Sequence, residues 1–167
     1  EAIRKETDAI RKETEANING LSSKYRNLGN NIGQTFEEGM INGLMKCEYF
    51  LKNKFDKAFP RMVAKNKENK PVMEVDMVFV NTSTLAMVEI KHGVTMEDVD
   101  DIVQNRIPNF RKYFNNFNNF DIIVYLGGGS ISKNVIEKAE KLGIGILRPS
   151  NEIFIHEVEA KILDKGK

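Results

Sequence analysis

The N-terminal residues carry an apolar stripe with helical spacing. The segment AIRKETD at 2–8 is repeated as AIRKETE at 9–15, and apolar or threonine positions continue in steps of four and three to Ile32, with one extra residue before Ile18. This alternation is typical of a coiled-coil seam with a local change in winding. We therefore expect residues 1–33 to form a coiled-coil helix that serves as a dimerisation stalk, while a solvated amphipathic helix with i,i+4 charge pairs fits the same pattern.

Two further patterns lie before the first expected strand. LGNNIG at 28–33 places two glycines and two asparagines in six residues, which predicts a hinge or turn. From Thr35, a good N-cap, a second helix is expected to reach about Phe59, where Pro60 stops it. Its core-facing stripe would consist of Phe36, Met40, Leu44, Cys47, Leu51 and Phe55. The polar residues 61–70 are expected to form a loop.

The rest of the chain alternates strand and helix signals. Residues 72–80 and 85–91 alternate with β-forming residues around a short NTST turn, which predicts an antiparallel hairpin. The short joints that follow predict a parallel βαβ crossover. The expected elements are a helix over 95–114 capped by Thr95 with Pro108 as a candidate break, a doubly buried strand over 121–126, a tight turn at GGGS 127–130, a helix over 132–142, a strand over 144–147, and a final strand or helix.

Composition limits the class of protein. The 167 residues, 41% of them hydrophobic and 29% charged, suit one globular domain with an appendage rather than a disordered chain. The single Cys47 excludes an internal disulfide framework and a multi-cysteine zinc site. We find no apolar run of transmembrane length and no signal peptide, so a cytoplasmic protein is expected. Because the sequence does not begin with Met, a longer parent chain is also expected.

Charge is informative only locally. Lys plus Arg total 25 and Asp plus Glu total 24, so the net charge indicates no partner. Residues 52–70, however, contain seven basic residues and two acidic ones. This local excess is consistent with contact to phosphate groups, and equally with an ordinary solvated face.

Three ionisable residues of the hairpin carry the candidate chemistry. Alternation along a strand puts Glu74, Asp76, Val78 and Val80 on one face and Val75, Met77 and Phe79 on the other, while Glu89 and Lys91 share a face of the second strand. Antiparallel pairing would bring Asp76 and Glu89 together, where two carboxylates repel each other unless a divalent cation lies between them. Oxygen ligands favour Mg²⁺ or Mn²⁺, beside which Lys91 would orient an attacking water or stabilise a phosphate in the transition state. The same residues would also suit a purely structural ion pair.

Asp76 followed by Glu89-Ile90-Lys91 resembles the motif of the PD-(D/E)XK nuclease superfamily. Together with LGNNIGQTFEEGMINGL, it also resembles a group of poorly characterised prokaryotic proteins that join an N-terminal coiled coil to such a domain. The resemblance covers roughly residues 28–150. It implies an α/β fold with a restriction-endonuclease-like αβββαβ core over 34–167, provided that a further strand lies at a hairpin edge or before Val72.

The resemblance also implies roles for individual residues. Asp76 and Glu89 would bind the metal, the main-chain carbonyl of Ile90 would join them, and Lys91 would be the motif lysine. Members often carry another acidic residue on the first helix, for which Glu37 is preferred over Glu38 and Glu48.

The leading expectation is a Mg²⁺- or Mn²⁺-dependent nuclease that hydrolyses DNA. Basic residues of 52–70, with Arg106, Arg111 and Lys112, would hold the nucleic acid backbone. The alternative is a non-catalytic nucleic-acid-binding or assembly module on the same fold, since a fold does not fix a function. In both hypotheses, a homodimer through the coiled coil is expected.

Overall fold

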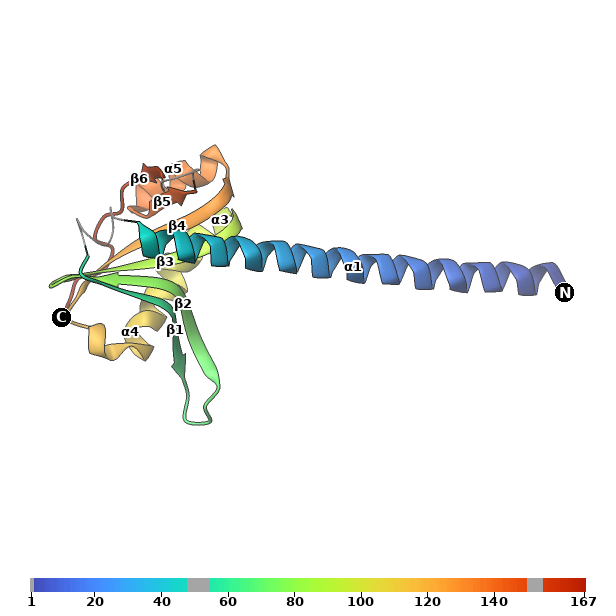
Figure 1. The fold of residues 1–167 in the computed structure, drawn as a ribbon, viewed down its shortest axis with the longest axis horizontal. Coiled ribbons are helices and arrows are strands. Elements are labelled where there is room, and N and C mark those ends of the chain that lie inside the picture. Colours follow the sequence, from blue (N-terminus) through green and yellow to red (C-terminus); the bar gives the residue numbers. More distant parts are fainter. Residues whose placement is uncertain (1, 48–54, 150–154) are drawn as a thin grey trace. The chain divides into compact units, whose positions relative to one another are not determined.

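The computed structural model describes residues 2–47, 55–149 and 155–167, in two compact units, Glu1–Thr35 and Phe36–Lys167. Helix α1 (Ala2–Lys46) supplies all the described residues of the first unit and the start of the second (Figure 1). None of the helices in the described ranges is long and apolar enough to cross a membrane.

The predicted hinge at residues 28–33 is wrong, as is the N-cap at Thr35, because α1 passes through both without interruption. A Cβ added at Gly29 or Gly33 would have no atom within 4 Å, so no close contact requires these glycines. Each costs a helix only about 1 kcal/mol relative to alanine, which the surrounding helix-forming residues offset.

The second unit contains one mixed sheet of six strands in the order β1-β2-β3-β4-β5-β6. Strands β1, β2 and β3 are antiparallel, β3, β4 and β5 are parallel, and β6 returns antiparallel to β5. The strands are β1 (Lys57–Lys65), β2 (Pro71–Val80), β3 (Thr84–Val94), β4 (Asp121–Ile131), β5 (Gly145–Arg148) and β6 (Ile155–Val158). The predicted hairpin and the predicted parallel crossover are both confirmed.

Strand β1 corrects the expectations for residues 57–70. In place of a helix that reaches Phe59 and a loop that follows it, residues 57–65 pair with β2 along its whole length. This is the additional strand before Val72 that the αβββαβ core requires. The helical stripe at Leu51 lies outside the described residues. The sequence pattern does not reveal β1 as a strand, because β1 is an edge strand with mixed burial. Its residues are neither continuously apolar nor strictly alternating.

Helices cover both faces of the sheet in three layers. On one face, α3 (Met96–Asp101), α4 (Ile107–Tyr113) and α5 (Lys133–Leu142) pack against a core that includes Val99, Phe110 and Val135. On the other face, Met40, Ile41 and Leu44 of α1 pack against a second core with Phe79 and Tyr125. The three-layer α/β architecture and the αβββαβ order of elements that the sequence predicts are therefore present.

The helix expected over residues 95–114 is present but changes its winding. Thr95 caps it as predicted, with a capping box that includes the Asp98 carboxylate. Between α3 and α4, residues Ile102–Arg106 form a π-helical turn, in which the Ile107 N–H donates to the carbonyl of Ile102. Pro108 lies just after this turn and does not end the helix, since the widened turn accommodates a residue that lacks an N–H.

The glycines of GGGS are part of β4, so the predicted tight turn at 127–130 is wrong. A Cβ at Gly127 would lie 2.8 Å from Met40 Cε, and one at Gly129 would lie 3.0 Å from Phe36 Cε2. The glycines therefore let residues 36–46 of α1 approach the sheet closely, a role that the sequence pattern does not distinguish from a turn.

Candidate active site

The site forms where β2 and β3 separate. Their main-chain pairing runs from Val80 with Leu85 to Met77 with Val88, and stops before Asp76. At that point the Asp76 side chain replaces a main-chain acceptor, because its Oδ2 accepts a hydrogen bond of 2.7 Å from the N–H of Ile90. The side chain of Asp76 thus holds the two strands together at the point where their backbones part.

The strand geometry around Asp76 departs from simple alternation. Val75 packs in the core beneath α3 and α4 together with Val78, whereas Met77 packs in the core beneath α1. The expectation that Val75 and Met77 share a face is therefore wrong. Across from this position on β1, Arg61 has a left-handed φ of 49°, so the irregularity extends to the neighbouring strand.

Glu89 is the buried polar or charged residue of the described core, with 9% of its surface exposed. It lies on β3 beneath α3, and burial raises the pKa of its carboxyl to about 7, although the Arg106 charge opposes this shift. Burial likewise raises the pKa of Asp76, against the hydrogen bond from Ile90 and with the negative charge of Glu37 adding to the shift. Both carboxyls are therefore in surroundings that disfavour negative charge.

The positive charge nearest to Glu89 is Arg106, from the π-helical turn. Its Nη2 donates both to the Glu89 carboxylate and to the main-chain carbonyl of Glu74. The guanidinium therefore connects β3 to β2 on the side where their main-chain pairing has ended. Its Nε is buried and has no hydrogen-bond partner.

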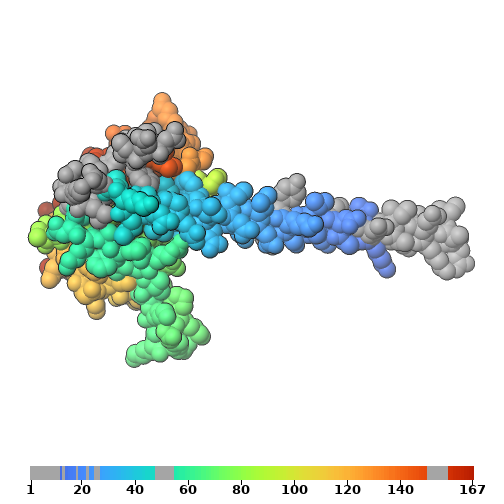
Figure 2. Space-filling view, viewed as in Figure 1, coloured from blue at the N-terminus to red at the C-terminus, as the bar shows by residue number. Residues whose placement is uncertain are grey.

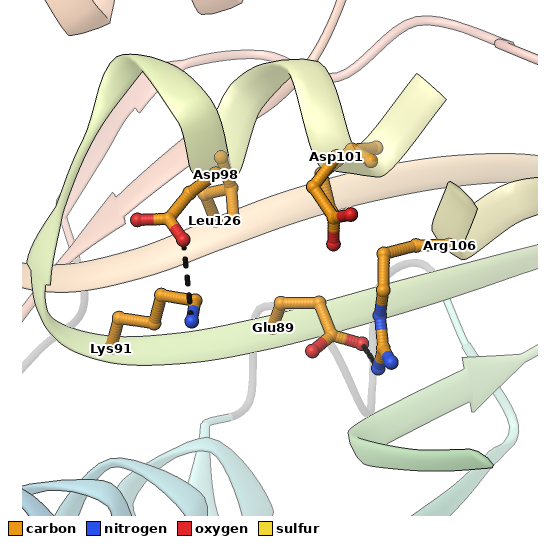
Figure 3. Close-up of a pocket in the computed structure, with 7 residues that line it drawn as sticks. Glu89, Lys91, Asp98, Asp101, Arg106 and Leu126 are labelled. Atoms are coloured by element: carbon orange, nitrogen blue, oxygen red, sulfur yellow. Dashed lines mark hydrogen bonds and ion pairs between the residues drawn. The ribbon is translucent and has the colours of Figure 1, made fainter. Parts of the chain in front are cut away.

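An open cavity of about 120 Å³ lies beside this ion pair (Figure 3). Lys91 reaches across it, with its Nζ 3.2 Å from Oδ1 of Asp98. Figure 3 shows Glu89 and Lys91 on β3 facing the same helical segment, with Asp98 and Asp101 above them. The lining residues are Glu89, Lys91, Asp98, Asp101, Ile102, Arg106 and Leu126.

The structure brings only part of the predicted site together. Glu89 and Lys91 line the same cavity, whereas Asp76 does not line it, although its charge raises the pKa of Glu89. Glu37 lies on α1 and forms an ion pair of 2.9 Å with Arg61. Glu38 is exposed, and Glu48 lies outside the described residues.

The donor groups fit a hard divalent cation in their chemistry. Asp76 and Glu89 offer carboxylate oxygens from adjacent strands, in surroundings that favour an added positive charge. In the part of the chain that the structure describes, however, no three His, Cys, Asp or Glu side chains lie close enough together to hold a metal ion. The guanidinium of Arg106 occupies one carboxylate of the pair instead.

The sequence does not predict two of the residues that line the cavity, Asp98 and Asp101. The four acidic residues after Thr95 are typical of a favourable first helical turn, and Asp98 does cap the helix. The additional signal is the short connection from Lys91 to this helix, which places the start of the helix beside Lys91.

Arg111 is not available to nucleic acid, contrary to expectation. Its side chain is 13% exposed and pairs with Asp164 at 2.6 Å. It also donates to the carbonyls of Phe117, Asn118 and Phe120, so it fixes the loop before β4 and the C-terminal residues. Lys112 and Gln104 are exposed.

Comparisons with known proteins give similarity of fold only. No family model matches the chain, and no curated protein matches it. Among solved structures, it is similar to a protein of unknown function, AF1548, with a TM-score of 0.45 and 15% identity over 68% of this chain and 61% of that one. It is also similar to the small subunit of the heterodimeric restriction endonuclease R.BspD6I, with a TM-score of 0.41 and 13% identity over 68% of this chain and 62% of that one. The chain thus spans about three fifths of each of these proteins, and neither similarity assigns it an activity.

Proposed function

We propose that the chain is a metal-dependent phosphodiesterase acting on DNA, with Asp76, Glu89 and Lys91 at its centre. The observation that carries this proposal is the buried carboxylate of Glu89, which shares a cavity with Lys91 where β2 and β3 separate. Burial of a charged carboxylate costs stability that an apolar residue at the same position would not cost, so a buried acid beside an open cavity is a candidate functional group.

The metal ligands would be the carboxylates of Asp76 and Glu89, the main-chain carbonyl of Ile90, and Glu37 from α1. Mg²⁺ or Mn²⁺ bound there would supply positive charge to stabilise the charge that develops on the scissile phosphate. Asp76 and Glu89 would hold that cation between adjacent strands, in surroundings of low dielectric constant.

Lys91 would act on the substrate itself. Its side chain is half exposed and is positioned across the cavity by Asp98. The ammonium group would donate to a phosphate oxygen or orient the attacking water, and the carboxylate of Asp98 would keep it on the cavity side.

The nucleic acid backbone would contact the basic hairpin formed by β1 and β2. Figure 2 shows the tip of this hairpin protruding from the body of the second unit, and the tip residues Lys65, Lys67 and Lys70 are exposed. Lys70 pairs with the exposed Glu68 at 2.9 Å, a contact that a phosphate would compete with. Binding through this tip would be independent of sequence and would weaken as salt rises.

The test is cleavage of linear, nicked, branched and single-stranded DNA by the purified chain in Mg²⁺ or Mn²⁺. Lys91→Ala should lower the cleavage rate by about 100-fold or more, the usual cost of losing one group that stabilises the transition state. Lys141→Ala, which removes an exposed lysine near the end of α5, is the matched control and should cleave at the wild-type rate. If no DNA form is cut and Lys91→Ala behaves as wild type, the proposal fails.

A second candidate is a non-catalytic DNA-binding or assembly module. The observation that favours it is that both carboxylates already have partners, Asp76 in the Ile90 N–H and Glu89 in Arg106. DNA binding that depends on salt, survives loss of Asp76, Glu89 and Lys91 together, and shows no turnover would favour this candidate over the enzyme.

A further inference from the structure

We propose that Arg106 is a built-in cation that competes with the divalent metal for Glu89, so that the Arg106–Glu89 ion pair holds the site in a metal-free state. This inference rests on the proposed function, because it concerns the same carboxylate. It assigns to Arg106 the control of metal affinity rather than the DNA contact expected from the sequence.

The first line of argument is the position of the guanidinium. Arg106 donates hydrogen bonds to Glu89 on β3 and to the Glu74 carbonyl on β2. It therefore spans the gap between the two strands that begins where their main-chain pairing stops, before Asp76. A cation shared by Asp76 and Glu89 would have to lie in that gap. The oxygen of Glu89 that bonds to Arg106 cannot at the same time direct the same lone pair to a metal.

The second line of argument is burial. The side chains of Arg106 and Glu89 are only 23% and 12% exposed, so water screens their interaction weakly. A second cation entering beside the guanidinium would meet like-charge repulsion in surroundings of low dielectric constant. We therefore expect metal binding to displace Arg106 from Glu89, because holding both cations beside one carboxylate would cost more free energy.

The third line of argument is that the Arg106 side chain has open space beside it into which it can move. Its Nε is buried with no partner, so the contact with Glu89 leaves one donor of the guanidinium unsatisfied, which costs stability. The residue lines the open cavity, and its backbone belongs to a π-helical turn, a local irregularity often found at functional sites. Movement of the side chain into the cavity would hydrate the guanidinium without disturbing the core beneath α3.

The test is calorimetric titration of the full chain with Mn²⁺, comparing wild type with Arg106→Gln, Arg106→Lys and the control Lys141→Gln, which removes an exposed charge on α5. Arg106→Gln should bind Mn²⁺ at least about tenfold more tightly, the lower end of what removing one nearby like charge produces. Arg106→Lys keeps the charge and should bind close to the wild-type affinity, as should Lys141→Gln. Thermal unfolding of each variant establishes that it is folded before titration.

A second readout follows the arginine directly. Addition of Mg²⁺ to the wild type should move the Arg106 Nε–H signal in side-chain NMR spectra, while the Arg111 signal stays in place because that side chain is locked by Asp164. If wild type binds Mn²⁺ and Arg106→Gln binds no more tightly, the inference is overturned and the proposed metal site stands. If no variant binds Mn²⁺, both the metal site and the inference are overturned. Binding by Arg106→Gln alone supports the inference most strongly.

Discussion

At the scale of single residues, Glu89 should make stability depend on pH. Its pKa is about 7 in the folded chain against 4.5 when unfolded, so folding binds a proton in that interval. Stability from this group is present at low pH and is lost as pH rises from about 4.5 to 7, with a total effect of about 3 kcal/mol. Glu89→Gln cannot ionise, so it should be more stable than wild type at pH 8 by about 1–3 kcal/mol, with a smaller difference at pH 5.

Urea unfolding followed by circular dichroism at both pH values checks this expectation. Glu140→Gln is the matched control, because Glu140 is exposed on α5 and its replacement should change the free energy of unfolding equally at pH 5 and pH 8. A Glu89→Gln variant less stable than wild type at pH 8 would show that Arg106 compensates the buried charge fully.

The candidate site also shows which residues a sequence can identify. Asp76, Glu89 and Lys91 stand out because acidic and basic side chains interrupt apolar strands, where they are costly without a partner. Arg106 can be identified from the sequence only as a basic residue for the nucleic acid backbone, because nothing in its helical stretch reveals the π-helical turn or the pairing with Glu89. The pairing of Glu37 with Arg61 is equally hidden, since the sequence pattern does not reveal β1 as a strand.

At the scale of elements, the errors have two physical causes. Local propensity suggests a hinge at 28–33 and a turn at 127–130, but glycine tolerates helix and strand as well as turns. In β4 its use is close packing, a tertiary requirement that a local pattern does not contain. The buried strand, the capped helix and the αL glycine that ends α5 are predictable because each has a local signal of its own.

Gly145 provides a test of close packing in the sheet. It is the first residue of β5 and pairs with Tyr125 of β4. A Cβ at Gly145 would overlap the Tyr125 ring and lie 3.0 Å from Ala160 Cβ, so Gly145→Ala should destabilise the fold by about 1–3 kcal/mol. Gly93→Ala is the matched control in β3, where the nearest atom to the new Cβ is 4.0 Å away, and it should be neutral or slightly stabilising. Equal midpoints for the two variants in chemical unfolding would contradict the packing argument.

At the scale of the whole molecule, topology is the most predictable property. A short turn permits only an antiparallel hairpin, and strands joined through a helix favour a parallel crossover, so the order of elements nearly determines the sheet. Both rules hold here, in β2–β3 and in β3–β4–β5. The assembly of chains lies beyond such rules, because it depends on which surfaces remain without a partner.

The exposed apolar face of α1 predicts that two chains associate. Leu21, Leu28 and Ile32 are 54%, 56% and 49% exposed, and their spacing places them along one face of the helix. An apolar stripe in water is stabilised by pairing with its copy, so we expect a homodimer through this face. Light scattering after size exclusion should give twice the mass of one chain for the wild type and a single chain for Leu21→Lys/Leu28→Lys. Ser23→Lys adds a charge on the opposite face at 100° per residue and should remain dimeric. A wild type that stays a single chain at high concentration would assign the stripe to a solvated helix, the other interpretation that its pattern permits.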